Sequence, residues 1–342
     1  MRKAQYTMQD IANQLGISKS TVSRALKNHP DISQETKDAV NKLAEEMDYQ
    51  PNSLALSLRH KKSFVLGIIV PEIVHDFFAN VISGVQSVAY EEGYNVMICI
   101  SNESPEQEKV DVKAMYSSRV DGLLISLTKE TKDLASLQSI INKGVPTVMF
   151  DRVAEELEVS KVITDDFQGA FMATEHLINQ GCKKIVHLSG PNNLAISKLR
   201  LKGYMAALDK NNIAVDESLI VPCPKGDLDE GKEVTKGILN SGLDFDAIFA
   251  NNDVSAIGAM NALKEEGKKI PEDVSVVGFG DWRLSQLLDP PLSSIEQSGF
   301  DIGLQAAKLL FEQIKAEEKD IEFSPRTEVV QNNLIKRASS LH

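Results

Sequence analysis

The 342-residue chain is 42% hydrophobic and 25% charged, an ordinary composition for a globular protein of two or three domains. It has only strand-length apolar runs, an N-terminus without the apolar core of a signal peptide, and three widely spaced cysteines. These features predict a cytoplasmic protein with no membrane span, disulfide framework or zinc site. The net charge of −12 is uneven: residues 1–62 hold 10 Lys and Arg against 7 Asp and Glu, whereas the rest hold 27 against 42. A small basic module joined to a large acidic body is indicated.

Residues 7–26, TMQDIANQLGISKSTVSRAL, predict two short helices joined by a tight turn. Thr7 and Asp10 are spaced for a capping box at the start of the first helix. Gly16 suits the left-handed residue that ends this helix, and Ser18 is a natural cap for the second one. Apolar residues recur at helical spacing through both segments, which together indicate a helix-turn-helix.

A third amphipathic helix follows Ser33 and completes a compact three-helix domain. In such domains the second helix enters the major groove of DNA. Lys19 and Arg24 carry donors that read guanine, while Thr21 and Ser23 suit phosphate oxygens. The alternative is a helical hairpin with an ordinary solvated face, which the coincidence of caps, turn glycine and polar face disfavours.

Residues 51–62, PNSLALSLRHKK, form an unusually apolar connection. Pro51 and Asn52 suit the start of a helix, on which Leu54 and Leu58 would share one face. A single apolar face on so short a helix is too little to hold it together in water. The segment therefore needs a partner, which is the same helix of a second subunit, DNA, or both.

From Ser63 onward, strand-like runs alternate with amphipathic helices in two series of similar size. The first series predicts the strands FVLGIIV, YNVMICI, GLLISL, VPTVMF and VSKVIT, helices around 78–92 and 106–117, and another before VPTVMF. The second predicts helices at 169–180, 198–211, 230–240 and 254–266 alternating with KIVHLS, SLIVPC, AIFAN and VSVVGF. Continuous Val- and Ile-rich strands spaced by helices indicate parallel sheets covered on both faces, so we expect two doubly wound lobes.

In doubly wound sheets, ligands bind outside the carboxyl ends of the strands. The residues that follow the predicted strands are polar or aromatic and suit a small polar ligand. They are His75 to Phe78, Ser101, Asn102, Ser126, Asp151, Arg152, Asp165, Asp166, Ser189 to Asn192, Asn251 to Asp253, and Gly280 to Trp282, with Arg200 in a following helix. Any one of them could instead cap a loop or helix, as Asp253 would before VSAIGAMNAL.

The pattern T-x-x-D-I-A-x-x-x-G-x-S-x-x-T-V-S-R-x-L, followed by a helix ending in Y-x-P-N, resembles the lactose-repressor/galactose-repressor (LacI/GalR) family of bacterial regulators. The resemblance extends along essentially the whole chain. It implies an all-α helix-turn-helix DNA-binding domain over 1–50, a hinge helix over 51–62 and an α/β effector domain over 63–342. That effector domain would be periplasmic-binding-protein-like, with two doubly wound parallel-sheet lobes joined by three crossings. Lobe 1 would hold about 63–162 and 293–320, and lobe 2 about 163–292 and 321–338.

The resemblance also implies which residues contact DNA. Lys19, Ser20 and Arg24 would select the operator sequence, and Leu58 would wedge into the minor groove while Leu54 and Ala55 face the twin helix. Gln9 and Leu56 depart from the residues that many members carry. The complete predicted set is Thr7, Lys19, Ser20, Thr21, Ser23, Arg24, Asn28, Asn52, Ala55 and Leu58.

Ligand contacts are implied in the same way. Arg200 is the strongest candidate, because a fixed guanidinium grips hydroxyls, carboxylate or phosphate bidentately. Gly280 replaces an acidic residue of many sugar-responsive members, beside Trp282, so a different sugar, an oligosaccharide or a partner protein stays open as the effector. The predicted ligand-contact set is Asp76, Phe77, Phe78, Ser126, Arg152, Asp166, Arg200, Asn252, Asp253, Asp281 and Trp282.

The sequence thus predicts a homodimeric, sequence-specific repressor whose affinity for a pseudo-palindromic DNA operator is controlled by a small ligand, a sugar or sugar derivative. We expect no cofactor, metal site or enzyme activity. A catabolite-control-type regulator governed by a partner protein is the alternative. A solute-binding module is disfavoured by the helix-turn-helix. An enzyme is disfavoured because the chain has no G-x-x-x-x-G-K-[ST] loop and the G-F-G at Gly278 does not open a helix after the first strand.

Overall fold

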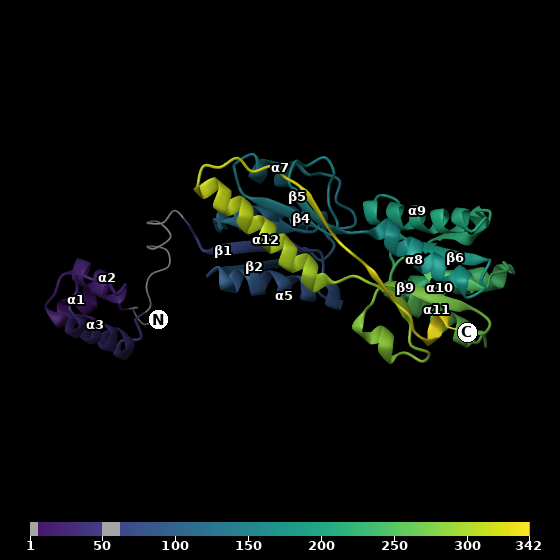
Figure 1. Cartoon of the computed structure of the whole chain (residues 1–342), viewed down its shortest axis with the longest axis horizontal. Coiled ribbons are helices and arrows are strands. Elements are labelled where there is room, and N and C mark those ends of the chain that lie inside the picture. Colours follow the sequence, from purple (N-terminus) through teal and green to yellow (C-terminus); the bar gives the residue numbers. More distant parts are fainter. Residues whose placement is uncertain (1–5, 50–61, 342) are drawn as a thin grey trace. The chain divides into compact units, whose positions relative to one another are not determined.

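The computed structural model describes residues 6–49 and 62–341, which belong to two compact units, Met1–Ser63 and Phe64–His342 (Figure 1). The predicted hinge contacts Asn52, Ala55 and Leu58 lie outside the described residues.

The first unit is a three-helix domain built from α1 (Met8–Leu15), α2 (Lys19–Leu26) and α3 (Gln34–Glu46). The predicted local signals are confirmed. Thr7 and Asp10 form a capping box, Gly16 ends α1 with a left-handed φ of 65°, and the hydroxyls of Ser18 and Ser33 cap α2 and α3. The three apolar faces meet in one core, whose buried members are Ile11, Ala12, Val22, Ala25, Val40, Leu43 and Ala44.

The second unit contains two six-stranded sheets. In the first, β11 (Thr327–Val330), β5 (Ser160–Thr164), β4 (Thr147–Phe150), β3 (Gly122–Ile125), β1 (Val65–Val70) and β2 (Asn95–Ile100) lie in this order and are parallel throughout. Core residues pack on both faces of the sheet, as predicted for parallel strands. The covering helices are α5 (Asp76–Glu91), α6 (Pro105–Ser117), α7 (Ala135–Ile141) and α12 (Gly299–Glu318).

The second sheet has the order β12 (Asn333–Ile335), β10 (Ser293–Glu296), β9 (Ser275–Gly280), β8 (Ala247–Ala250), β6 (Ile185–Ser189) and β7 (Ile220–Pro222). All pairs are parallel except β10 with β12, which is antiparallel at the edge. Its covering helices are α8 (Asp166–Asn179), α9 (Ala195–Lys210), α10 (Leu228–Ser241) and α11 (Asp253–Glu265), with short 3-10 turns at Glu217–Leu219, Arg283–Leu287 and Ala338–Ser340.

The chain passes between the lobes three times within residues 62–341, as Figure 1 shows for the segment that leaves α12 and continues through the second lobe. Each crossing comes later than the resemblance implied. The first follows Thr164, because β5 pairs with β4; the second follows Glu296, because β10 pairs with β9; and the third follows Val330, because β11 pairs with β5. The predicted limits at 162, 292 and 320 are therefore corrected. The physical reason is that each crossing segment completes a strand before it leaves its sheet.

Helices on the same sheet face pack closely where glycine removes a side chain. A Cβ placed on Gly303 of α12 would overlap the carbonyl oxygen of Val81 in α5, and one on Gly258 of α11 would overlap that of Leu228 in α10. Such backbone-to-backbone contact sets the distance between helix axes. Among the described residues, no helix is both long and apolar enough to cross a membrane.

Candidate functional site

The exposed side of α2 carries the residues predicted to read DNA. Val22 and Ala25 are buried against α1 and α3, which turns Lys19, Ser20 and Arg24 to the surface. Two cationic donors therefore stand on the helix face opposite the core. Thr21 and Ser23, half-buried, flank this face, and exposed Thr7 and Asn28 lie before α1 and after α2.

Hydroxyl groups hold the start of α2 rigidly. The Ser18 hydroxyl accepts the backbone N–H of Thr21 at 3.1 Å and lies 2.7 Å from the Ser20 hydroxyl and 2.8 Å from that of Thr21. At the start of α1, the backbone N–H and the hydroxyl of Thr7 donate to the Asp10 carboxylate at 2.7 and 2.8 Å, and these two hydrogen bonds lower the pKa of Asp10. Side chains at both helix starts are thus ordered by local bonds before any partner arrives.

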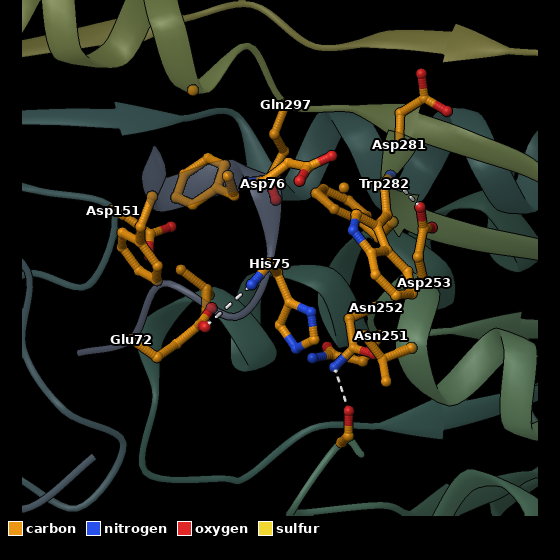
Figure 2. A pocket seen from close by; sticks show the side chains of 18 of the residues that line it. Glu72, His75, Asp76, Asp151, Asn251, Asn252, Asp253, Asp281, Trp282 and Gln297 are labelled. Atoms are coloured by element: carbon orange, nitrogen blue, oxygen red, sulfur yellow. Dashed lines mark hydrogen bonds between the residues drawn. The ribbon is translucent and has the colours of Figure 1, made fainter. Parts of the chain in front are cut away.

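A cleft of about 840 Å³ separates the two lobes, at the carboxyl ends of their parallel strands (Figure 2). Nine of the eleven predicted ligand-contact residues line it. Those nine are Asp76, Phe77, Phe78, Arg152, Arg200, Asn252, Asp253, Asp281 and Trp282. Only Ser126 and Asp166 do not reach its surface.

The first lobe presents Arg152 just after β4. Its guanidinium donates to Glu103 at 2.7 Å, lies 3.8 Å from the carboxylate of Asp151 and sits 5.7 Å above the ring of Phe78. Burial raises the pKa of Asp151 to about 6, although Arg152 opposes the shift. Arg152 is therefore already neutralised by its own lobe.

Ser126, which follows β3, is fully buried, and its hydroxyl accepts the backbone N–H of Arg152 at 3.4 Å. Ser126 therefore does not line the cleft, as a direct ligand contact would require. The rule that selects residues after parallel strands gives their position along the chain but not the side to which each one turns.

The second lobe presents Arg200 from α9. Its Nε and Nη2 both lie 2.7 Å from Asp166, Nη1 donates to the carbonyl of Asn251, and the guanidinium stacks 3.6 Å from the ring centre of Phe279. Asp166 is 3% exposed and lies behind Arg200, so it is the counterion of this arginine and not part of the cleft surface. Burial raises the pKa of Asp166, and Arg200 opposes that rise.

Asp253 holds the loop that carries Trp282. Its carboxylate accepts the backbone N–H of Trp282, the hydroxyl of Ser285 at 2.8 Å and the hydroxyl of Ser294. Burial raises the pKa of Asp253 to about 6, against these hydrogen bonds. The interpretation of Asp253 as the cap of α11 is wrong, because the cap is Asn252, whose side chain accepts the backbone N–H of Ser255 at 2.8 Å.

Asp281 adopts a left-handed φ of 47° and makes a two-bond ion pair with Arg337, at 2.5 and 3.2 Å. Sequence reasoning missed Arg337, because this residue reaches the cleft only after the third crossing. Gln297 was missed for a similar reason. It lies at the second crossing, donates to the hydroxyl of Thr164 at 3.0 Å and accepts from Arg200 at 3.5 Å.

The lobes touch across the cleft. His75, from the loop after β1, meets Trp282 edge-to-face with 5.3 Å between ring centres (Figure 2). At another point, the ammonium of Lys129 in the first lobe donates to the carbonyl of Lys225 in the second at 2.9 Å. These contacts place groups of both lobes within reach of one small ligand. Across the described ranges 6–49 and 62–341, no three His, Cys, Asp or Glu side chains are grouped to hold a metal ion.

Comparison with known families divides the chain as the structure does. Residues 7–52 match the family described as bacterial regulatory proteins, lacI family, and residues 63–337 match periplasmic binding proteins and sugar binding domain of LacI family.

Individual relatives agree with these matches. The ribose operon repressor of Halalkalibacterium halodurans is 34% identical over 314 residues, which cover 92% of each chain. Among solved structures, a lac repressor dimer bound to operator and the anti-inducer ONPF is 26% identical with a TM-score of 0.87, covering 99% of this chain and 100% of that one. A complex of the transcriptional regulator CelR with cellobiose is 28% identical with a TM-score of 0.73, covering 98% and 99%.

Proposed function

The chain belongs to the LacI family of bacterial regulatory proteins, and on that premise we propose that it is a homodimeric repressor whose operator affinity is set by a small carbohydrate in the inter-lobe cleft. The single observation that carries the proposal is the pairing, in one chain, of a helix that exposes Lys19 and Arg24 with a two-lobed cleft. It acts in the cytoplasm, where its operator DNA is.

On the DNA side, α2 enters the major groove, and Lys19, Ser20 and Arg24 read base edges. Thr7, Thr21, Ser23 and Asn28 contact the backbone and fix the register. The hinge residues Asn52, Ala55 and Leu58 complete the interface by way of the minor groove. These assignments rest on position in the family motif and, for α2, on its exposed face.

On the ligand side, relatives and structural neighbours are named for ribose and cellobiose. The cleft supports a carbohydrate here as well, because it combines aromatic rings such as Phe77 and Trp282 with hydrogen-bonding groups from both lobes. Its volume of about 840 Å³ suits a small ligand. No turnover is proposed: ligand binding closes or opens the lobes, and that change alters the geometry of the hinge segments.

An electrophoretic mobility shift with a library of palindromic duplexes, at several salt concentrations, tests the DNA-binding half. We expect one selected site to bind about a thousandfold more tightly than random DNA, with a steep loss of affinity at high salt. Equal affinity for selected and random duplexes would exclude sequence-specific repression.

Ligand control is tested on the selected operator. A carbohydrate that raises the melting temperature of the protein should change its operator affinity by about 5- to 150-fold. A ligand that stabilises the protein and leaves operator affinity unchanged would show that the cleft does not regulate the DNA-binding helices.

A further inference from the structure

Three of the four arginines that line the cleft each have a carboxylate of their own. Arg152 pairs with Glu103 at 2.7 Å, Arg200 with Asp166 at 2.7 Å, and Arg337 with Asp281 through two bonds. The arginine side chains of these pairs are 5–18% exposed and the acidic side chains are 3–28% exposed. Solvent therefore screens the pairs little. None of these three guanidiniums therefore keeps an unpaired positive charge that could bind an anionic ligand.

The remaining charges also disfavour an anion. The lining holds seven acidic residues against six basic ones, and Asp166 adds another carboxylate behind Arg200. Two of the other basic side chains, Lys225 and Arg283, are exposed, where water and salt screen them, and the half-buried ammonium of Lys129 donates to the carbonyl of Lys225 at 2.9 Å. Burial raises the pKa of Asp151 and of Asp253 to about 6, so each carboxyl is disfavoured as an anion at its own buried position.

Neutral hydrogen-bonding atoms without a partner, in contrast, are present at the cleft wall. Asn251 lines the cleft and is 7% exposed, and its Oδ1 is buried without a hydrogen-bond partner. His75 also lines the cleft, and its Nδ1 is likewise buried without a partner. The buried hydroxyl of Ser197 is unpartnered too, although Ser197 does not line the cleft. A Cβ on Gly190 would overlap both Ser197 and Asn251, so the glycine leaves room for this polar pair. Acceptors of this kind suit the hydroxyl groups of a ligand.

We propose that the cleft binds an uncharged, polyhydroxylated ligand, rejects the phosphorylated form of the same ligand, and uses Asn251 and His75 as acceptors for ligand hydroxyls. The inference rests on the proposed function and deepens it by naming the charge class of the effector. Arg200 was predicted to grip hydroxyls, carboxylate or phosphate; its ion pair with Asp166 disfavours the two anionic groups.

Matched ligand pairs test the charge class. Isothermal titration of the full chain with ribose and ribose 5-phosphate, with cellobiose and its 6-phosphate, and with a nucleoside and its 5′-monophosphate compares ligands that differ only in charge. We expect at least one neutral member to bind and its phosphate ester to bind about tenfold or more weakly.

The outcomes separate the two proposals. A phosphate ester that binds as tightly as its neutral partner overturns the charge inference and leaves ligand control intact. If no member of any pair binds at millimolar concentration, the result counts against the charge inference and the proposed function together, because the cleft then binds none of these carbohydrates.

The Asn251→Leu variant tests the hydrogen-bonding role. Replacing a buried unpartnered acceptor by an apolar group should leave the melting temperature of the free protein equal or higher, while ligand affinity falls about tenfold. The matched variant Asn252→Leu removes the cap of α11 and should lower the melting temperature instead. Unchanged affinity in both Asn251→Leu and His75→Phe would overturn the assignment.

The Glu103→Gln variant tests the charge argument directly. It removes the counterion of Arg152 at nearly constant shape, so the phosphate esters should gain about fivefold or more in affinity while the neutral members change little. No gain for any ester would show that the ion pair does not determine ligand charge.

Discussion

His187 shows how one buried side chain links stability to pH. It lies in the middle of β6, fully buried, with its ring stacked between those of Tyr204 and Phe249 at 5.2 and 4.9 Å. Nδ1 donates to the carbonyl of Phe249 at 3.1 Å, which leaves Nε2 as an unpartnered lone pair in the neutral ring. Burial lowers the pKa of His187 from its ordinary 6.5 to about 4.

Because the folded protein favours the neutral ring, the stability that His187 contributes is present above pH 6.5 and is lost as pH falls toward 4. We expect the unfolding free energy of the protein, relative to that of His187→Phe, to fall by about 1.4 kcal/mol per pH unit across this range. Urea unfolding of both proteins at pH 7, 5.5 and 4.5 measures the difference. The comparison is needed because Asp151 and Asp253, with pKa values raised to about 6, contribute with the opposite sign. A pH-independent difference would contradict it.

Arg24 is the residue from which we expect base discrimination. Removing it with Arg24→Ala should cost about 1–3 kcal/mol at one operator base pair and relax the preference there. Lys42→Ala is a matched control, because it also removes one exposed positive charge from the same unit, on α3. Binding to operators mutated at each position, at constant salt, distinguishes them. Equal, position-independent losses would assign Arg24 to the phosphate backbone.

Two glycines in neighbouring helices separate packing from helix propensity. Gly258 of α11 faces the backbone of α10, whereas nothing lies within 4 Å of a Cβ on Gly237 of α10. The same chemical change should therefore have opposite effects at the two positions.

We expect Gly258→Ala to destabilise the second lobe by about 1–3 kcal/mol, because the helices must separate. Gly237→Ala should stabilise it by about 0.5–1 kcal/mol, because alanine restricts the unfolded chain and favours the helix. Denaturant unfolding of both variants measures the two changes. Equal losses of unfolding free energy in the two variants would show that the close approach of α10 and α11 does not determine how well each glycine tolerates alanine.

The whole molecule operates as a regulator only if its DNA-binding unit and its lobes are coupled, and the hinge segment 51–62 is the connection between them. Coupling between two binding sites is reciprocal, so operator must alter ligand affinity by the factor by which ligand alters operator affinity.

Leu58→Ala should weaken binding to the selected operator by about tenfold or more and leave binding to random DNA nearly unchanged, because an apolar wedge acts only on a bent, specific complex. Leu56→Ala is the matched control, since Leu56 would lie away from the face shared by Leu54 and Leu58. Fluorescence anisotropy with both duplexes at one salt concentration measures the losses. Equal losses of affinity for the selected operator and for random DNA would show that Leu58 contributes only ordinary packing.

Local signals determined much of this protein from the sequence alone. Caps, turn glycine and apolar spacing located α1, α2 and α3, because helix ends are set by hydrogen bonds between residues only three or four apart. The alternation of Val- and Ile-rich runs with helices predicted two parallel sheets, and nine of the eleven candidate ligand contacts line the cleft between them.

Only the tertiary structure decided which partners these side chains have. Whether Ser126 turns inward, whether Asp166 lies behind Arg200, and where Arg337 and Gln297 arrive all depend on strand pairing between segments distant in sequence. The same strand pairing explains why the three crossings come later in the chain than the predicted limits at residues 162, 292 and 320. Neutralisation of the cleft arginines follows from contacts across 34 to 56 residues of chain, and no short-range pattern specifies contacts of that length.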